Sequence, residues 1–426
     1  MNLSKAKVRF STNLVKLAHY FVTNRNGFNK SAFLLLKYVT KKSTGYNLYE
    51  IRNVKDYCQE YDLAYNVLRS DRIGYSWTSA SNLNGMNSQM ICEILPDIAL
   101  AKLQDVYITS NSDYIVNHKE GIVVNDYCAN NSDENKTYVD GITLAYWGRC
   151  CLTKSIKDKE TIPTGIMLSG KFAFNYYHNM YENLIRFMLV DEYGNNLPAD
   201  IPIIFDEEVL VIPSLKLIFD LFINKTNRKV ITISRYKEYK IESLYYFTGI
   251  NLLTPQHVNP SVGKATDFLF DKHYVKKYAN ELLRLGCDKV FPKRIFITRA
   301  NVKKRNFNEE EVFDVLKPLG FVSVAPEKLS FQEQIALFHG ADIIVGGSGA
   351  AFTNMLFASK GCRAFIIISR GGMPSACFNA PAYINGAEIS FYQSSDKMNN
   401  GIHADFSVDI DQFSSYVQDY IAPLCK

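Results

Sequence analysis

The chain has 426 residues, of which 47% are hydrophobic, and it includes 27 tyrosines and 27 phenylalanines. A chain of this length is too long to fold around one ordinary hydrophobic core, so we predict two domains. The high apolar content excludes extensive intrinsic disorder. The net charge is only +5 and no run of about 18 apolar residues occurs, which excludes a membrane-spanning segment.

Residues 1–60 are predicted to form a basic helical segment. The first 49 residues contain nine Lys or Arg and no Asp or Glu, so the rest of the chain carries a net charge of −4. Apolar stretches such as VKLAHYFV and SAFLLLKYV accompany these charges. The segment is interpreted either as an element that rests on an anionic membrane surface or as a solvated helical pair packed on the next domain. No nucleic-acid motif accompanies the charge, so nucleic acid is not an expected partner.

Residues 61–265 are predicted to form an N-terminal α/β domain. Its first hundred residues show short strands between polar turns. From residue 161 a buried strand, TIPTGIMLSG, precedes a helix at 171–194. A strand at 201–208, a helix at 214–223 and a strand at 229–235 follow. Alternation of this kind predicts a parallel, doubly wound sheet.

A second α/β series follows a loose stretch at 254–275. Residues 266–400 are predicted to form a domain that alternates four more strands with helices, and residues 401–426 a final helix that packs back toward the first domain. The strands are RIFITR, FVSVA, DIIVGG and CRAFIIIS. The predicted fold class is therefore α/β, with two Rossmann-like domains facing a cleft and a helical N-terminal extension.

In the stretch ADIIVGGSGAAFTNMLF, a predicted strand ends in small residues, and a helix is predicted to begin directly after them. Ser348, Gly349 and Ala350 would present backbone N–H groups and the positive end of a helix dipole to an anion. Arg299 ends the strand RIFITR and Arg305 lies in the loop after it, so both are expected at the same carboxyl edge of the sheet, and their guanidinium groups are suited to a phosphate. The alternative is a tight packing turn with no ligand.

The segment FNYYHNMYE is the candidate source of a general base. His178 and Glu182 are separated by four residues and share one helix face. An imidazole held by a carboxylate can accept a proton, and we favour His178 as the base with Glu182 orienting it; Glu182 itself is the second candidate. The alternative is a surface pair or a buried structural histidine. Asn175 and Tyr177 are predicted to contact the acceptor, although Asn175 is also a plausible N-cap.

The nine cysteines and seven histidines show no metal-binding spacing. Scattered thiols favour a reduced, cytoplasmic protein, and the N-terminus lacks the features of a secretory signal. We predict no metal site and no cofactor.

Two blocks of the sequence resemble glycosyltransferase family 61. One is NYYHNMYENLIRF, with the pattern N-x-x-H-x-x-x-E. The other runs from RIFITR to GAAFTNMLF and contains an R-x-x-N-E turn, a P-E pair, an F-x-E-Q-I helix and a final G-A-x-x-T-N motif. The resemblance covers about 190 residues and none before about residue 160.

This resemblance implies a B-type (GT-B) glycosyltransferase fold whose C-terminal domain binds a nucleotide sugar. It implies inverting, metal-independent transfer, usually from a UDP-sugar, to an oligosaccharide or polysaccharide acceptor of capsule or lipopolysaccharide type. The protein would be cytoplasmic or peripheral on the inner face of the membrane. The donor-binding residues expected from the residues and the resemblance together are Arg299, Arg305, Asn308, Glu327, Ser348, Gly349, Ala350 and Asn354.

The sequence departs from the family pattern at one place. Many members carry a histidine where this chain has Ser348, so Ser348 receives no catalytic role. Asn308 and Glu309 have helix capping as an equal alternative, and Asn354 and Gln334 have a structural alternative. Two other functions stay open: a polysaccharide pyruvyl transferase-like enzyme, and a non-catalytic scaffold of a polysaccharide assembly complex.

Overall fold

A computed structural model describes most of the chain, with residues 1–2 and several internal segments left out. The described residues are 3–23, 27–77, 90–125, 142–252, 257–259, 264–266, 268–300, 304–369, 376–394 and 404–426. They form two compact units, Met1–Arg72 with Pro96–Leu252, and Ile73–Leu95 with Leu253–Lys426. The second unit thus begins about a dozen residues earlier than the predicted boundary, and it contains a segment from the first quarter of the chain.

Among the described residues, the first unit is built on one mixed sheet of eleven strands. In spatial order the strands are β12 (Val230–Ile233), β11 (Ile203–Asp206), β10 (Asp158–Met167), β13 (Lys237–Phe247), β5 (Ile98–Thr109), β6 (Ile115–Asn117), β7 (Ile122–Val124), β1 (Asn47–Arg52), β9 (Cys150–Thr153) and β8 (Thr143–Trp147), with β2 (Tyr65–Arg69) also pairing with β5. Strands β12, β11 and β10 are parallel, as the sequence predicts, because helices connect β10 to β11 and β11 to β12. Strand β13, which the sequence analysis did not predict, is also parallel to β10. The long β13 then pairs antiparallel with β5, which extends the sheet beyond the predicted part.

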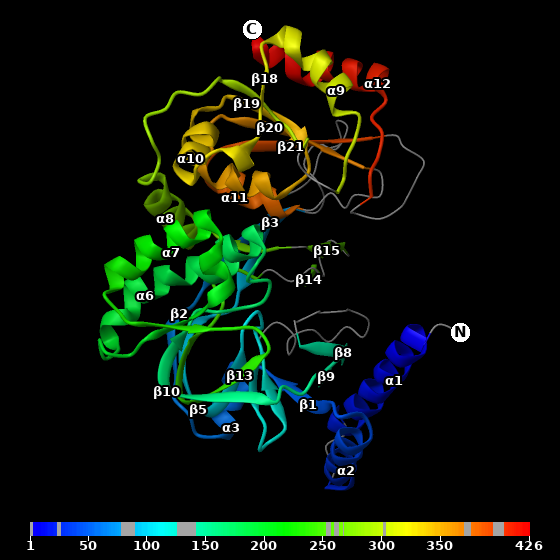
Figure 1. Ribbon diagram of the computed structural model, residues 1–426, viewed down its shortest axis with the longest axis vertical. Helices are drawn as coiled ribbons and strands as arrows, with labels where there is room; N and C mark the ends of the chain where they lie inside the picture. The colour runs from blue at the N-terminus through cyan, green and yellow to red at the C-terminus, as the bar shows by residue number, and fades with distance from the viewer. Residues whose placement is uncertain are drawn as a thin grey trace. The chain divides into compact units, whose positions relative to one another are not determined.

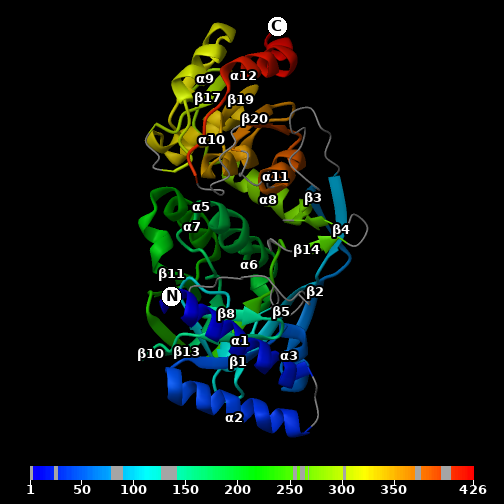
Figure 2. The same ribbon diagram turned by 90° about the vertical axis from the view of Figure 1, so that its right-hand side faces the viewer.

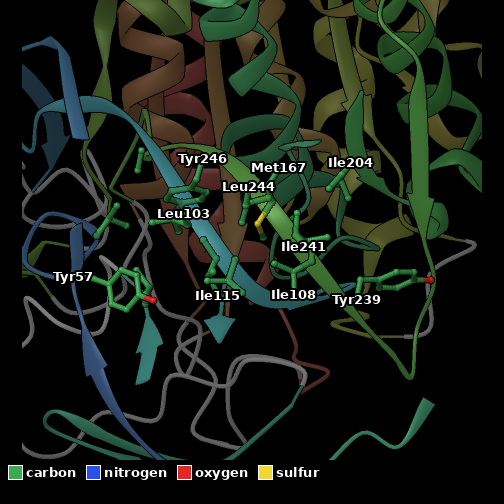
Figure 3. Packing of buried hydrophobic residues seen from close by; sticks show 14 of the residues in the cluster. Tyr57, Leu103, Ile108, Ile115, Met167, Ile204, Tyr239, Ile241, Leu244 and Tyr246 are labelled. Carbon is green, nitrogen blue, oxygen red and sulfur yellow. The ribbon is translucent and has the colours of Figure 1, made fainter. Parts of the chain in front are cut away.

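The core of the first unit lies on this sheet and under α3 (Val54–Glu60). Figure 3 shows the side chains of Leu103, Ile108, Ile241 and Leu244 packed together from β5 and β13, with Tyr57 of α3 at one side. Because β5 and β13 are paired over nine residue positions, their inward-facing side chains form a continuous apolar layer. This layer supports β10, whose C-terminal end leads to the segment with the candidate base.

The N-terminal helices α1 (Leu3–Thr23) and α2 (Gly27–Thr44) belong to the first unit. Helix α1 lies beside β8 and β9 (Figure 1) and α2 beside β1, and together they bury Val15, Ala18 and Phe33 against Leu48 and Leu152. The prediction of a wholly helical segment through residue 60 is wrong at β1, which is paired on both sides within the sheet. An alternating run at Asn47–Arg52 follows a left-handed glycine, Gly45, and such a turn ends α2.

The second unit contains a parallel sheet of five described strands. Its order is β18 (Val322–Val324), β17 (Arg294–Ile297), β19 (Ile343–Gly347), β20 (Arg363–Ile368) and β21 (Glu388–Gln393). Helices α9 (Glu309–Leu316) and α12 (Ile410–Tyr416) cover one face, and α10 (Phe331–Gly340) and α11 (Asn379–Ile384) lie on the other (Figure 1). The sequence predicts four of these strands and misses β21 and α11. A small separate sheet joins β3 (Arg72–Trp77), β4 (Met90–Leu95) and β16 (Phe270–Asp271).

The C-terminal helix does not follow the prediction that it packs toward the first domain. Helix α12 lies beside α9 (Figure 2) and buries Phe413, Tyr416 and Val417 in the core of the second unit. The reason is its apolar stripe, which fits over Phe365 and Tyr392 of the parallel sheet. Among the described helices, none has the length and apolar character needed to cross a bilayer.

Candidate functional site

The helix that carries His178 begins at Asn175 and contains a wide turn. The Asn175 side chain accepts hydrogen bonds from the N–H groups of Tyr177 (3.0 Å) and His178 (3.5 Å), which confirms its N-cap geometry. After α5 (Tyr176–His178) the chain forms a π-helical turn at Asn179–Asn183 and continues to α6 (Phe187–Tyr193). The continuous helix predicted from residue 171 is therefore shorter and irregular. Single π-turns in helices are frequent at functional sites.

His178 and Glu182 form the predicted pair. The Nδ1 atom of His178 lies 2.5 Å from Oε1 of Glu182. The imidazole is 20% exposed, whereas the Glu182 side chain is 1% exposed. A carboxylate on Nδ1 holds the proton there and leaves Nε2 with its lone pair, so the arrangement suits a general base.

Behind Glu182 lies a buried cation that the sequence analysis did not select. The Nζ atom of Lys171 is 3.6 Å from Oε2 of Glu182 and 3.6 Å from Oδ2 of Asp113, and all three side chains are at most 2% exposed. The backbone N–H of Lys171 also donates to Oδ1 of Asp113 (3.0 Å). A buried lysine between two carboxylates offsets their negative charges. Lys171 therefore stabilises the position of the Glu182 carboxylate that contacts Nδ1 of His178.

The turn after β10 carries backbone strain at Phe172. Its φ angle of +53° is in the left-handed region, which is unusual for a bulky aromatic residue. The turn is held by a hydrogen bond from the N–H of Ala173 to Oδ1 of Asn111 (2.8 Å), and the Phe172 ring lies 4.5 Å from the His178 ring between centroids. Strain of this kind persists where the surroundings impose it, and here it places one ring against the imidazole.

Asp206, the last residue of β11, anchors the same turn. Its carboxylate accepts hydrogen bonds from the N–H groups of Asn111 (2.8 Å) and Gly170 (3.1 Å). Burial raises the pKa of Asp206 to about 6, although these two hydrogen bonds oppose the shift.

This raised pKa predicts a pH-dependent stability. An unfolded aspartate titrates near pH 4, so between about pH 4 and pH 6 the folded state holds a proton that the unfolded state has released. The free energy of unfolding contributed by this group is therefore fully present below about pH 4 and falls as pH rises through 6. Denaturant unfolding of the wild type and Asp206→Asn at several pH values measures it. The variant loses one acceptor and is less stable throughout, but its decline over this range should be shallower. Equal declines would show that Asp206 does not titrate there.

The anion-binding candidates of the second unit lie at a topological switch point. With β17 as the first strand of this sheet, the order runs 2-1-3-4-5, so the connections leave β17 and β19 in opposite directions. Ligands of open parallel sheets bind outside the carboxyl ends of the strands at such a point. Arg299 and Ser348 follow these two strands, so the structure brings together the two segments that the sequence analysis paired.

Arg299 is buried between the two loops. It is 8% exposed, and its Nη1 and Nη2 atoms donate to the carbonyl oxygens of Ser348 (3.0 Å) and Lys304 (2.8 Å). A Cβ at Gly349 would collide with Nη1 of Arg299, and one at Gly347 would lie 2.8 Å from its Cδ atom. The glycines of this stretch thus make room for the arginine, not directly for a phosphate as we expected from the sequence.

Arg305 adds a second guanidinium near the first. Burial, followed by the charge of Arg305, lowers the pKa of Arg299, and burial also lowers the pKa of Arg305. The Nε atoms of both arginines are buried with no hydrogen-bond partner. Arg305 has a φ angle of +56°, again in the left-handed region. An anionic ligand would stabilise two adjacent cations of this kind, because it would balance their charge and accept hydrogen bonds from the unused donors.

One of the three predicted backbone donors is already used. The N–H of Ser348 donates to the carbonyl of Ile367 (2.9 Å), so it extends the β19–β20 ladder and is not free for a ligand. The helix that follows is the 3₁₀ helix η7 (Ala350–Phe357), shorter than the helix predicted at 349–361. The N–H groups at Gly349 and Ala350 precede its first internal hydrogen bond, from Phe352 to Gly349.

The other donor-site candidates have structural contacts. Asn308 exchanges hydrogen bonds with the backbone of Val408 (2.8 and 3.0 Å). Asn354 donates to Gln334 (3.0 Å) inside the unit. Glu327 is exposed in a short 3₁₀ turn after β18. Its charge acts on Arg299 and partly opposes the lowering of the Arg299 pKa by burial.

Glu309 has a structural contact that the capping alternative did not foresee. Its carboxylate accepts hydrogen bonds from the hydroxyl of Thr298 and from the N–H of Arg299 (2.7 Å). The carboxylate thus fixes the loop after β17, where Arg299 begins.

Of the two acceptor-site candidates, Asn175 is exposed and Tyr177 is buried. The Tyr177 ring packs edge-on against those of His178 (5.5 Å) and Tyr181 (5.1 Å). Asn175 uses its side-chain oxygen for the helix cap. Both stay predictions as acceptor contacts. In the residues described, no group of three or more His, Cys, Asp and Glu has a geometry that could hold a metal ion.

Comparison with protein families agrees with the resemblance. Residues 176–365 match the model of a family described as Glycosyltransferase 61. The matched segment is just under half of the chain, and it includes His178, Glu182 and the loops after β17 and β19. The match supports a glycosyltransferase, which acts in general on a nucleotide sugar and a glycan acceptor. Lys171 and Asp113 lie before the matched segment. A search of curated proteins found no match.

Proposed function

We propose that the chain is an inverting, metal-independent glycosyltransferase with a GT-B arrangement. It moves a sugar from a UDP donor to a hydroxyl of a growing surface polysaccharide, of capsule or lipopolysaccharide type. The observation that carries the proposal is the pair of guanidinium groups, of Arg299 and Arg305, whose buried Nε donors are unused at the switch point of the parallel sheet. This pair lies within the segment that matches the glycosyltransferase family.

The proposed reaction is a single displacement. Nε2 of His178 takes the proton of the acceptor hydroxyl, whose oxygen attacks the anomeric carbon. The bond from that carbon to the diphosphate oxygen breaks with inversion, and UDP leaves with the electron pair. Arg299, Arg305 and the N–H groups of Gly349 and Ala350 stabilise the charge that develops on the diphosphate. Fixed positive groups thereby serve the purpose that a metal ion serves elsewhere.

Glu182 and Lys171 have positioning roles in this proposal. Glu182 fixes the tautomer of His178 through Nδ1, and Lys171 supports the charge of Glu182. Neither side chain contacts the substrate in the mechanism. Glu182 remains the second candidate for the base.

An assay of nucleotide release tests the proposal. The full-length protein is incubated with a panel of nucleotide sugars and glycan acceptors, and UDP release is followed together with product mass. Acceptor-dependent UDP release supports the proposal. Consumption of phosphoenolpyruvate without nucleotide release would assign a pyruvyl transferase, and nucleotide binding without turnover in the whole panel would assign a scaffold.

Arg299→Ala is expected to weaken UDP binding by about 10- to 100-fold, because hydrogen bonds to charged groups contribute about 1.5–3 kcal/mol each. Isothermal titration calorimetry with UDP measures the change. Arg294→Ala is the matched control, since Arg294 lies at the opposite end of the same strand and also donates to backbone carbonyls. Equal affinity in the wild type and Arg299→Ala would remove Arg299 from the donor site.

A further inference from the structure

Helix α2 has an apolar face that packs against nothing in the described part of the first unit. Its inner face buries Phe33 and Thr40 toward β1 and β9. On its outer face the side chains of four large hydrophobic residues are about half exposed or more. They are Leu34 (50%), Leu35 (64%), Tyr38 (58%) and Val39 (49%). Residues 34, 35, 38 and 39 recur at helical spacing, so these side chains share one stripe.

The charge around this stripe has a single sign. Of the lysines on α2, Lys42 lies on this face, whereas Lys37 lies against Gly121 and Lys41 donates to Asn47 (2.8 Å). The first 49 residues contain no acid. Lys42 is exposed, and its Nζ atom lies 5.2 Å from the centroid of the Tyr38 ring. A partner for this surface must therefore be anionic as well as apolar.

These two properties disfavour a second copy of the helix as the occupant. Two α2 stripes packed around a twofold axis would bring lysines of like charge together without an acidic residue on either helix. Four half-exposed side chains also provide much less area than the roughly 800 Å² per partner of a stable interface. An anionic bilayer satisfies both requirements, because apolar side chains and the tyrosine ring enter the interface while lysines reach the headgroups.

We propose that the outer face of α2 is a docking surface for anionic lipid bilayers. The helix lies in the plane of the interface, with Leu34, Leu35, Tyr38 and Val39 in the acyl boundary and Lys42 at the headgroups. The opposite face of α2 stays packed on the sheet, so binding requires no unfolding of the first unit. The contact is reversible and sensitive to salt, since it rests on few apolar side chains and on charge. This proposal does not depend on the glycosyl transfer reaction.

Vesicle flotation with the full chain tests the proposal. Vesicles contain phosphatidylcholine alone or with phosphatidylserine. We expect co-flotation only with phosphatidylserine present, and its loss at about 1 M salt, where the Debye length is about 3 Å. Deletion of residues 1–49 would be a poor test, because β1 begins at Asn47 and the helices supply part of the core.

Point variants with matched controls locate the surface. Lys42→Glu should reduce lipid binding by more than about fivefold, and Leu35→Gln with Tyr38→Gln should abolish it. The controls Lys229→Glu and Val211→Gln change exposed residues near β11 and β12, at the other edge of the sheet from β8, and should bind as the wild type. An unchanged unfolding midpoint shows that each variant is folded.

Three results would overturn the proposal. One is no binding of the wild type to phosphatidylserine vesicles, and another is equal binding by the α2 variants and their controls. The third is a dimer in size-exclusion chromatography that Leu35→Gln with Tyr38→Gln dissociates, which would assign the stripe to a second copy.

Discussion

His178→Ala is expected to lower turnover by about 10²- to 10⁴-fold and to leave UDP affinity nearly unchanged. A positioned base typically contributes a rate factor of this size. Donor affinity should be preserved because His178 lies in the first unit, whereas the arginines proposed to bind the diphosphate lie in the second. Single-turnover kinetics measures the chemical step, and calorimetry with UDP measures the affinity.

The neighbouring carboxylate gives this prediction its control. Glu182→Gln keeps an oxygen that can accept a hydrogen bond from Nδ1 of His178 but removes the charge that balances the imidazolium, so turnover should fall while UDP affinity stays unchanged. If Glu182→Gln abolishes turnover and His178→Ala does not, the carboxylate is the base. If both variants keep full activity, neither residue is catalytic.

The second unit is the part that the sequence predicts well. Parallel strands are buried on both faces, so RIFI, IIVGG and AFIII appear as continuous apolar runs between amphipathic helices. Strand order has no such local signal. The sequence therefore places Arg299 and Ser348 each after a strand, while the pairing of β17 with β19 that makes their loops neighbours comes from the structure.

The first unit departs further from expectation because its sheet is held by long-range pairing. Strands β5 and β13 are antiparallel partners more than a hundred residues apart, and β1 pairs with β7 and β9. Such pairs depend on tertiary packing, which a local pattern does not encode. The same limit applies to residues Ile73–Leu95, which join the second unit.

In the candidate site as well, local spacing predicts some contacts and only the structure shows the others. The pair His178 and Glu182 follows from helical spacing alone. Lys171 and Asp113 are 58 residues apart, so no spacing rule connects them. One signal was present, since Lys171 follows directly after the buried strand TIPTGIMLSG, where a charge is unexpected. Asp206 similarly ends the buried strand IIFD.

Lys171→Met is expected to lower both the free energy of unfolding and the rate of transfer. The substitution keeps the volume of the side chain but leaves the carboxylates of Asp113 and Glu182 buried without their cation. Removing one partner of a buried ion pair costs about 3–5 kcal/mol. Without its cation, the buried Glu182 carboxylate is also no longer held in the position from which it contacts Nδ1 of His178. The rate should fall for this second reason even at temperatures where the variant is fully folded.

A second substitution separates the two effects. Asp113→Asn keeps an acceptor for the N–H of Lys171 and removes one of the two negative charges. Lys171→Met with Asp113→Asn should therefore be more stable than Lys171→Met alone. The double variant has one buried carboxylate without a cation, whereas Lys171→Met has two. The transfer rate should stay low in the double variant, since Glu182 still lacks its cation. Recovery of the rate together with stability would show that Lys171 only supports the fold, and an unchanged pH–rate profile in Lys171→Met would lead to the same conclusion.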